Sequence, residues 1–147
     1  MQARKPSGTP SAASSTSKPL EPLTFFLDES LDSDSVVTAL RGAGASVERL
    51  TAHFPKGTPD EAWLAEAGRK HWVVLTRDKR IRYRQLERLA LQQAGVRAFV
   101  FTGGNVTIKD TGAILASALT RMNKIARADA GPFIYHIPRS GTPVRMV

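Results

Sequence analysis

The chain has 147 residues, a length that fits one domain with its own hydrophobic core, and it carries a formal net charge of +8. It has no cysteine, which excludes disulfides, a thiolate zinc site and a cysteine nucleophile. No apolar run approaches the ~20 residues of a membrane-spanning helix, so we expect a soluble, cytoplasmic protein without membrane association.

Residues 1–22 are rich in Ser, Thr, Ala and Pro and show no hydrophobic periodicity. Such a segment cannot bury enough apolar surface to offset the entropy that is lost on ordering. We therefore predict a disordered tail over residues 1–22 and a single folded domain over residues 23–147.

Strand and helix patterns alternate from Leu23 onward. Short apolar runs predict strands over residues 23–27, 45–50, 72–75, 96–101 and 133–137. Apolar positions three to four residues apart predict helices between these strands, and the longest helix begins at Thr107 and runs through Ile125. Because strands and helices alternate in units of about 30 residues, the strands are expected to pair in parallel. The predicted fold class is α/β, a three-layer sandwich around a mostly parallel five-stranded sheet.

Two of the predicted strands are followed by carboxylates. Asp28 and Glu29 follow the first strand, and Asp78 follows the third. In open parallel sheets, sites form beyond the carboxyl ends of the strands, so we expect these side chains to converge. Mg²⁺ and Mn²⁺ prefer hard oxygen ligands, which makes Asp28 and Asp78 candidate metal ligands, with Glu29 as a further candidate. The simpler interpretations are a loop or helix-cap role for Asp28 and an ion pair with basic neighbours for Asp78.

A third carboxylate lies at the start of the second predicted helix. Thr58 is the predicted N-cap, Pro59 takes the first position, and Asp60 and Glu61 follow in the first turn. An acid in the first turn stabilises a helix N-terminus in any case, so capping explains these residues as well as metal binding does. Asp60 is the preferred third ligand, with Glu61 as its alternative. Asn105 follows the fourth strand and offers an uncharged, weaker oxygen ligand.

A cationic segment surrounds Asp78. From Arg77 to Arg97 the chain has seven Lys or Arg residues and two acids. Such a cluster suits a polyanion, whereas the simpler interpretation is a solvated helix face. The residues expected to contact nucleic-acid phosphates are Arg77, Lys79, Arg80, Arg82 and Arg84. Tyr83, among them, either stacks on a nucleotide or anchors the helix as a half-buried residue.

Five short motifs, taken together, resemble a PIN-like domain, the nuclease fold of VapC-type toxins, in its small-protein branch. They are Leu27-Asp28-Glu29, Pro59-Asp60-Glu61, the run Leu75-Thr76-Arg77-Asp78-Lys79-Arg80-Ile81-Arg82, the Thr-Gly-Gly-Asn turn at 102–105 and the closing Phe-Ile and Arg-Ser-Gly segments. The resemblance extends from about Leu23 to Gly141.

The resemblance implies a metal-dependent endoribonuclease that cleaves RNA with a metal-activated water. Asp28, Asp60 and Asp78 would form its catalytic acidic triad, with Mg²⁺ or Mn²⁺ as cofactor. It also implies that the protein is the toxin of a toxin–antitoxin pair, with an antitoxin as partner, and that it dimerises. Many PIN nucleases carry a fourth acid after the fourth strand, where this chain has Asn105.

Two alternative functions remain open from the sequence. One is a catalytically inactive PIN-like module that binds RNA or protein through the basic segment. The other is a phosphoacceptor receiver domain, whose acids and Thr are matched by Asp28, Asp78 and Thr102. The receiver interpretation is weaker, because Ile137-Pro138-Arg139 provides no Lys after the last strand.

Overall fold

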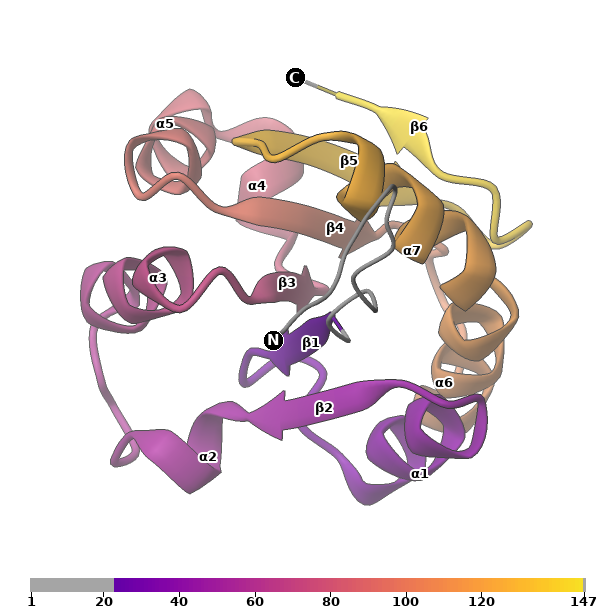
Figure 1. Ribbon diagram of the computed structural model, residues 1–147. Coiled ribbons are helices and arrows are strands. Elements are labelled where there is room, and N and C mark those ends of the chain that lie inside the picture. The colour runs from indigo at the N-terminus through magenta and orange to yellow at the C-terminus, as the bar shows by residue number, and fades with distance from the viewer. Residues whose placement is uncertain (1–22, 147) are drawn as a thin grey trace, which may run out of the picture.

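The computed structural model describes residues 23–146, except for the side chain of Arg82. The tail predicted over residues 1–22 lies outside the described residues. Within the described range, one sheet has the strand order β2-β1-β3-β4-β5-β6 (Figure 1). The strands are β1 Thr24–Leu27, β2 Ser46–Arg49, β3 Val73–Thr76, β4 Arg97–Phe101, β5 Phe133–Ile137 and β6 Val144–Arg145.

The first five strands are parallel, and β6 pairs antiparallel with β5. The α/β class and the mostly parallel sheet predicted from the sequence are therefore confirmed, with one strand more than predicted. The sequence does not reveal β6, because two exposed residues are too few to show an alternating pattern.

Helices cover both faces of the sheet (Figure 1). Those in the described range are α1 Asp34–Gly42, α2 Leu50–His53, α3 Asp60–Arg69, α4 Lys79–Tyr83, α5 Gln85–Gln93, α6 Ile108–Ser117 and α7 Leu119–Ala128. One face packs against α1, α6 and α7, and the other packs against α3, α4 and α5. The three layers predicted from the sequence are thus present.

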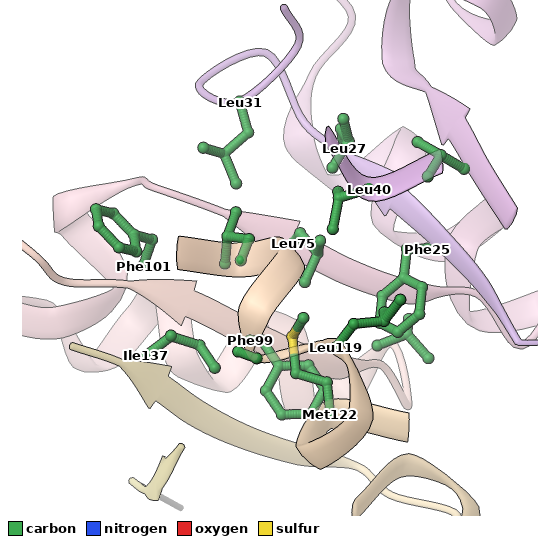
Figure 2. Close-up of a cluster of buried hydrophobic side chains, with 14 of the residues drawn as sticks. Phe25, Leu27, Leu31, Leu40, Leu75, Phe99, Phe101, Leu119, Met122 and Ile137 are labelled. Carbon is green, nitrogen blue, oxygen red and sulfur yellow. The ribbon is translucent and has the colours of Figure 1, made fainter. Parts of the chain in front are cut away.

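Successive residues of each buried strand point to opposite faces of the sheet. Phe25 of β1 packs on the face of α1, α6 and α7, whereas Phe26 stacks on Trp72 on the other face, with ring centroids 5.0 Å apart. Figure 2 shows Leu119 and Met122 of α7 packed near Phe25 and Phe99 in the first of these cores. Because both of their faces are buried, β1, β3 and β4 have the near-continuous apolar sequences from which they were predicted.

Two local predictions about helices differ from the structure. The Thr58 hydroxyl donates to the carbonyl of Pro55 over 2.6 Å instead of capping α3, and Pro59 is the N-cap residue without a side-chain hydrogen bond. The helix predicted from Thr107 through Ile125 is divided at Ala118 into α6 and α7. The apolar spacing continues across this division without a proline or glycine, so the sequence contains no sign of it.

The direction of the chain across the sheet reverses around β1. The chain passes from β1 to β2 on one side and then crosses to β3 on the other side of β1. The connections contain α1 on one face and α3 on the opposite face. In open α/β sheets, the crevice beyond the strand ends at such a reversal is where ligands bind.

Candidate metal and nucleic-acid site

A pocket of about 550 Å³ lies beyond the carboxyl ends of β1 and β3, at this reversal point. Its lining includes Asp28, Asp60 and Asp78, the three acids singled out in the sequence. Glu29, which is exposed, also lines it. The fold thus brings together carboxylates from three separate segments. We call this space the acid pocket.

Asp28 is the buried member of the acid pocket and is only 7% exposed. Its Oδ1 atom accepts hydrogen bonds from the Ser30 N–H at 3.0 Å and from the Ser30 hydroxyl at 2.5 Å. Its Oδ2 atom accepts from the Thr76 hydroxyl at 2.5 Å. Burial raises the pKa of Asp28 to about 6, although these hydrogen bonds oppose the rise.

Thr76, at the end of β3, connects Asp28 to Asp78. Its hydroxyl donates to Asp28 and accepts from the Asp78 N–H at 3.0 Å. The Ser30 hydroxyl likewise accepts from the Arg77 N–H at 2.8 Å. Ser30 and Thr76 are not among the site residues predicted from the sequence. The available signal was a hydroxyl residue two positions after or before each strand-end acid, a spacing typical of local side-chain-to-backbone turns.

Asp78 is the N-cap residue of α4, and its Oδ1 atom accepts from the Arg80 N–H at 2.9 Å. The Arg80 guanidinium also binds this carboxylate, with Nη2 2.6 Å from Oδ2. Burial opposes ionisation of Asp78, but the hydrogen bonds from Arg80 outweigh it and lower the pKa of Asp78. Reciprocally, the hydrogen bond to Asp78 raises the pKa of Arg80.

Asp60 lies on another wall of the acid pocket, in the first turn of α3. Its Oδ1 atom accepts from the Trp63 indole N–H at 3.0 Å, and its Oδ2 atom lies 3.1 Å from Arg80 Nη2. Glu61, the alternative ligand, is exposed and does not line the acid pocket. Asn105 lines a different pocket, near Asp110 and Arg139. The structure therefore places neither Glu61 nor Asn105 beside the three aspartates.

The residue types of the acid pocket suit a hard divalent cation, because carboxylate oxygens are its preferred ligands. Their present arrangement is different: among the described residues, no three acidic or histidine side chains are positioned to hold one ion. The oxygens of Asp28 are bonded to Ser30 and Thr76, and the Arg80 guanidinium joins Asp78 to Asp60. The chemistry fits a metal site at Asp28, Asp60 and Asp78, provided that Arg80 moves aside.

The cations of the basic segment differ in their exposure and in the contacts that they make. Arg77 donates to the carbonyls of Gly104 at 2.9 Å and Val106 at 3.1 Å, which ties the loop after β4 to the end of β3. Lys79 and Arg84 are exposed. The side chain of Arg82 lies outside the described residues.

A second pocket, of about 350 Å³, adjoins the acid pocket at Asp78, which lines both. Its walls include Arg77, Lys79 and Tyr83. Tyr83 is 72% exposed, so the half-buried anchor that the sequence left open for it is wrong. We call this space the basic pocket.

Topology and site together define an α/β domain with a carboxylate-lined pocket where the sheet connections reverse. A PIN like domain family model matches residues 23–103, more than half of the chain, so the protein belongs to the PIN-like domain family. The matched range includes all three aspartates of the acid pocket and the whole basic segment. The family assignment also removes the receiver-domain alternative.

The comparisons with curated proteins and with solved structures gave no significant match. No helix in the described part of the chain is long and apolar enough to cross a membrane.

Proposed function

We propose that this protein is a metal-dependent endoribonuclease whose catalytic site is the acid pocket. One observation carries the proposal: Asp28, Asp60 and Asp78, which lie far apart in the sequence, line one pocket at the reversal point of a parallel sheet. PIN-like domains are often nucleases, which agrees with this use of the pocket. The proposed substrate is RNA, and the proposed cofactor is Mg²⁺ or Mn²⁺.

Several residues of the chain would have separate roles in such a reaction. Asp28 and Asp78 are oriented by the single hydroxyl of Thr76, and Asp60 faces them from α3. When bound by these carboxylates, Mg²⁺ or Mn²⁺ supplies positive charge at the scissile phosphate and a water nucleophile at neutral pH. Lys56, which also lines the acid pocket, attracts the RNA backbone to its rim.

Lys79 and Tyr83 extend the proposed RNA path beyond the acid pocket. Both line the basic pocket, which meets the acid pocket at Asp78. A Lys side chain binds phosphate as a point charge, and an exposed aromatic ring provides a surface for a nucleobase. An RNA strand that crosses Asp78 would therefore have its reacting phosphate on one side and a flanking nucleotide on the other.

Calorimetric titration with Mn²⁺ tests the metal site directly. The wild-type protein should give a saturable signal that Asp28→Asn and Asp78→Asn each remove. Asp110→Asn is the matched control, because Asp110 is exposed in the first turn of α6 and does not line the acid pocket. An unchanged signal in both site variants would eliminate this metal site.

An RNA cleavage assay tests the reaction itself. Wild-type protein should cleave single-stranded RNA in the presence of Mn²⁺, and EDTA should stop the cleavage. Cleavage that continues undiminished in EDTA would contradict a metal-dependent mechanism.

A second candidate is a PIN-like module that binds RNA without cleaving it. The observation that favours it is the Arg80 guanidinium, which already pairs with two of the three carboxylates. In that case, RNA binding should be the same with EDTA and with Mn²⁺, and calorimetry should detect no Mn²⁺ binding.

The toxin–antitoxin role is a finer proposal and rests on the resemblance to VapC-type toxins. It predicts a small DNA-binding protein encoded in the adjacent reading frame, which copurifies with this chain and blocks RNA cleavage. It also predicts a homodimer in size-exclusion chromatography with light scattering. An adjacent frame unrelated to DNA binding would argue against the toxin role and leave the nuclease proposal in place.

A further inference from the structure

Arg80 joins two walls of the acid pocket. Its Nη2 atom lies 2.6 Å from Asp78 Oδ2 and 3.1 Å from Asp60 Oδ2. Its Nε atom lies 3.0 and 3.1 Å from the two carboxylate oxygens of Asp78. One guanidinium therefore holds together a carboxylate that follows β3 and a carboxylate from the first turn of α3.

This guanidinium competes with any cation for the same oxygens. Asp60 and Asp78 are two of the three acids that the proposed function assigns to a divalent ion. A divalent ion at these oxygens and Arg80 in its present position would be like charges in close contact, so they exclude each other. With Arg80 in this position, no three acids among the described residues are placed around one point.

A phosphate, unlike a divalent ion, is a binding partner for the Arg80 guanidinium. Guanidinium groups bind phosphate oxygens with the same two-pronged geometry that they use for carboxylates. The Arg80 side chain is 46% exposed and lines the acid pocket, so a phosphate that enters this pocket can reach it. Transfer of the guanidinium from the carboxylates to a phosphate frees the oxygens of Asp60 and Asp78.

We propose that Arg80 couples RNA binding to metal binding. In the RNA-free protein it competes with divalent ions for the carboxylates of the acid pocket and weakens their binding, and it moves onto a phosphate of the substrate when RNA binds. RNA and the divalent ion then each raise the affinity for the other, by the same factor in both directions. This inference rests on the proposed function and adds to it a coupling between the two ligands, in which the metal site has its full affinity only when substrate is present.

The coupling is measured by calorimetric titration of Mn²⁺ with and without a saturating single-stranded 2′-O-methyl oligonucleotide, whose intactness is checked on a gel. For the wild type, the oligonucleotide should tighten Mn²⁺ binding by roughly fivefold or more, the range of typical allosteric coupling. Mn²⁺ should tighten oligonucleotide binding by the same factor. Arg80→Ala should bind Mn²⁺ more tightly than the wild type in the absence of oligonucleotide, and the oligonucleotide should no longer change that affinity.

Two further variants separate this role from a general effect of charge or folding. Arg84→Ala removes a cation close enough to lower the pKa of Asp78 but without the carboxylate contacts of Arg80, so it should weaken oligonucleotide binding and preserve the coupling factor. Arg80→Lys keeps the charge and loses the two-pronged contact, so its coupling should lie between those of the wild type and Arg80→Ala. Thermal melts of each variant establish that it is folded.

The outcomes distinguish this inference from the proposed function. Mn²⁺ binding to the wild type with no effect of the oligonucleotide, or coupling that persists in Arg80→Ala, would overturn the role of Arg80 and leave the metal site intact. Failure of both the wild type and Arg80→Ala to bind Mn²⁺, with or without oligonucleotide, would overturn both.

Discussion

The Thr76 hydroxyl donates a hydrogen bond to Asp28 Oδ2 over 2.5 Å, although the two residues lie 48 positions apart. Both are buried, and Thr76 is the only fully enclosed hydroxyl that contacts an acid of the site among the hydrogen bonds of the described residues. This bond fixes the carboxylate that follows β1 against the end of β3.

Replacing Thr76 by Val tests this bond, because Val keeps the shape of the side chain and removes the hydroxyl. The carboxylate of Asp28 and the N–H of Asp78 then each lose a partner, and a buried polar group left unsatisfied costs about 1–3 kcal/mol. We expect Thr76→Val to lower the free energy of unfolding by that amount in urea denaturation. Thr76→Ser, which retains the hydroxyl, should lose less, and equal losses in both variants would point to packing instead.

The pH dependence of stability reports on Asp28. Burial raises its pKa from 3.8 to about 6, so between these values the folded state holds a proton that the unfolded chain has released. The stabilising contribution of this protonation is complete below about pH 4 and is lost as the pH rises through about 6. The difference corresponds to about 3 kcal/mol.

Asp28→Asn removes this titration. We expect the free energy of unfolding of the wild type, relative to Asp28→Asn, to fall by up to about 3 kcal/mol between about pH 4 and about pH 7. Urea denaturation at a series of pH values measures it. A difference in unfolding free energy that stays constant with pH would show that folding does not raise the pKa of the Asp28 carboxyl group.

Tyr83 tests whether a nucleobase occupies the basic pocket. Stacking of a base on an aromatic side chain contributes about 1–3 kcal/mol, so Tyr83→Ala should weaken binding of a single-stranded RNA oligonucleotide roughly 5- to 150-fold. Tyr83→Phe keeps the ring and should bind as the wild type does. Fluorescence anisotropy with labelled RNA makes the comparison, and equal binding by all three proteins would remove Tyr83 from the RNA path.

Lys79 tests the ionic part of RNA binding. Each phosphate contact that is lost reduces the dependence of log affinity on log salt concentration by about 0.7 for a single strand. We expect this reduction in Lys79→Gln. Lys109→Gln is the control, because Lys109 is exposed on α6 and lines neither the acid pocket nor the basic pocket. Identical slopes for the two variants would contradict a phosphate contact at Lys79.

A substitution at Gly68 tests how α3, which carries Asp60, is held in place. A Cβ atom at this position would overlap the backbone carbonyl of Ala94, at the end of α5. Gly68→Ala should therefore destabilise the fold by about 1–3 kcal/mol through overpacking. Thermal melts of the two variants make the comparison with Gly42→Ala, at the end of α1. A Cβ atom at Gly42 would have no atom within 4 Å, so this variant should be neutral or slightly stabilised.

Much of the architecture could be predicted because its causes are local in the sequence. Apolar runs identified the five parallel strands, and the rule that parallel strands end at a common edge predicted that Asp28 and Asp78 would meet. Asp60 lines the same pocket, but the strand-end rule does not predict its position, which depends on where α3 packs against the sheet.

The partners of the acids could not be predicted in the same way. Asp78 lies among several basic residues that are close in sequence, two of them adjacent to it, and only the path of α4 selects Arg80 from them. The ion pair from Arg80 to Asp60 links residues 20 positions apart on different helices. The role of Thr76 was hidden for another reason: a threonine at the end of a strand is ordinary by its β propensity.

The acid pocket is built from two kinds of wall. Asp28 and Thr76 adjoin or belong to β1 and β3, and each of these strands is paired on both sides within the sheet. Asp60 and Arg80 belong to helices on one face, and α4 has only five residues. Displacing a doubly paired strand breaks hydrogen bonds along both of its edges, whereas a short helix can shift without disturbing the sheet. Under the proposed function, adjustment to an incoming RNA therefore falls on the helical side, and the strands provide the fixed frame against which its phosphate would be aligned.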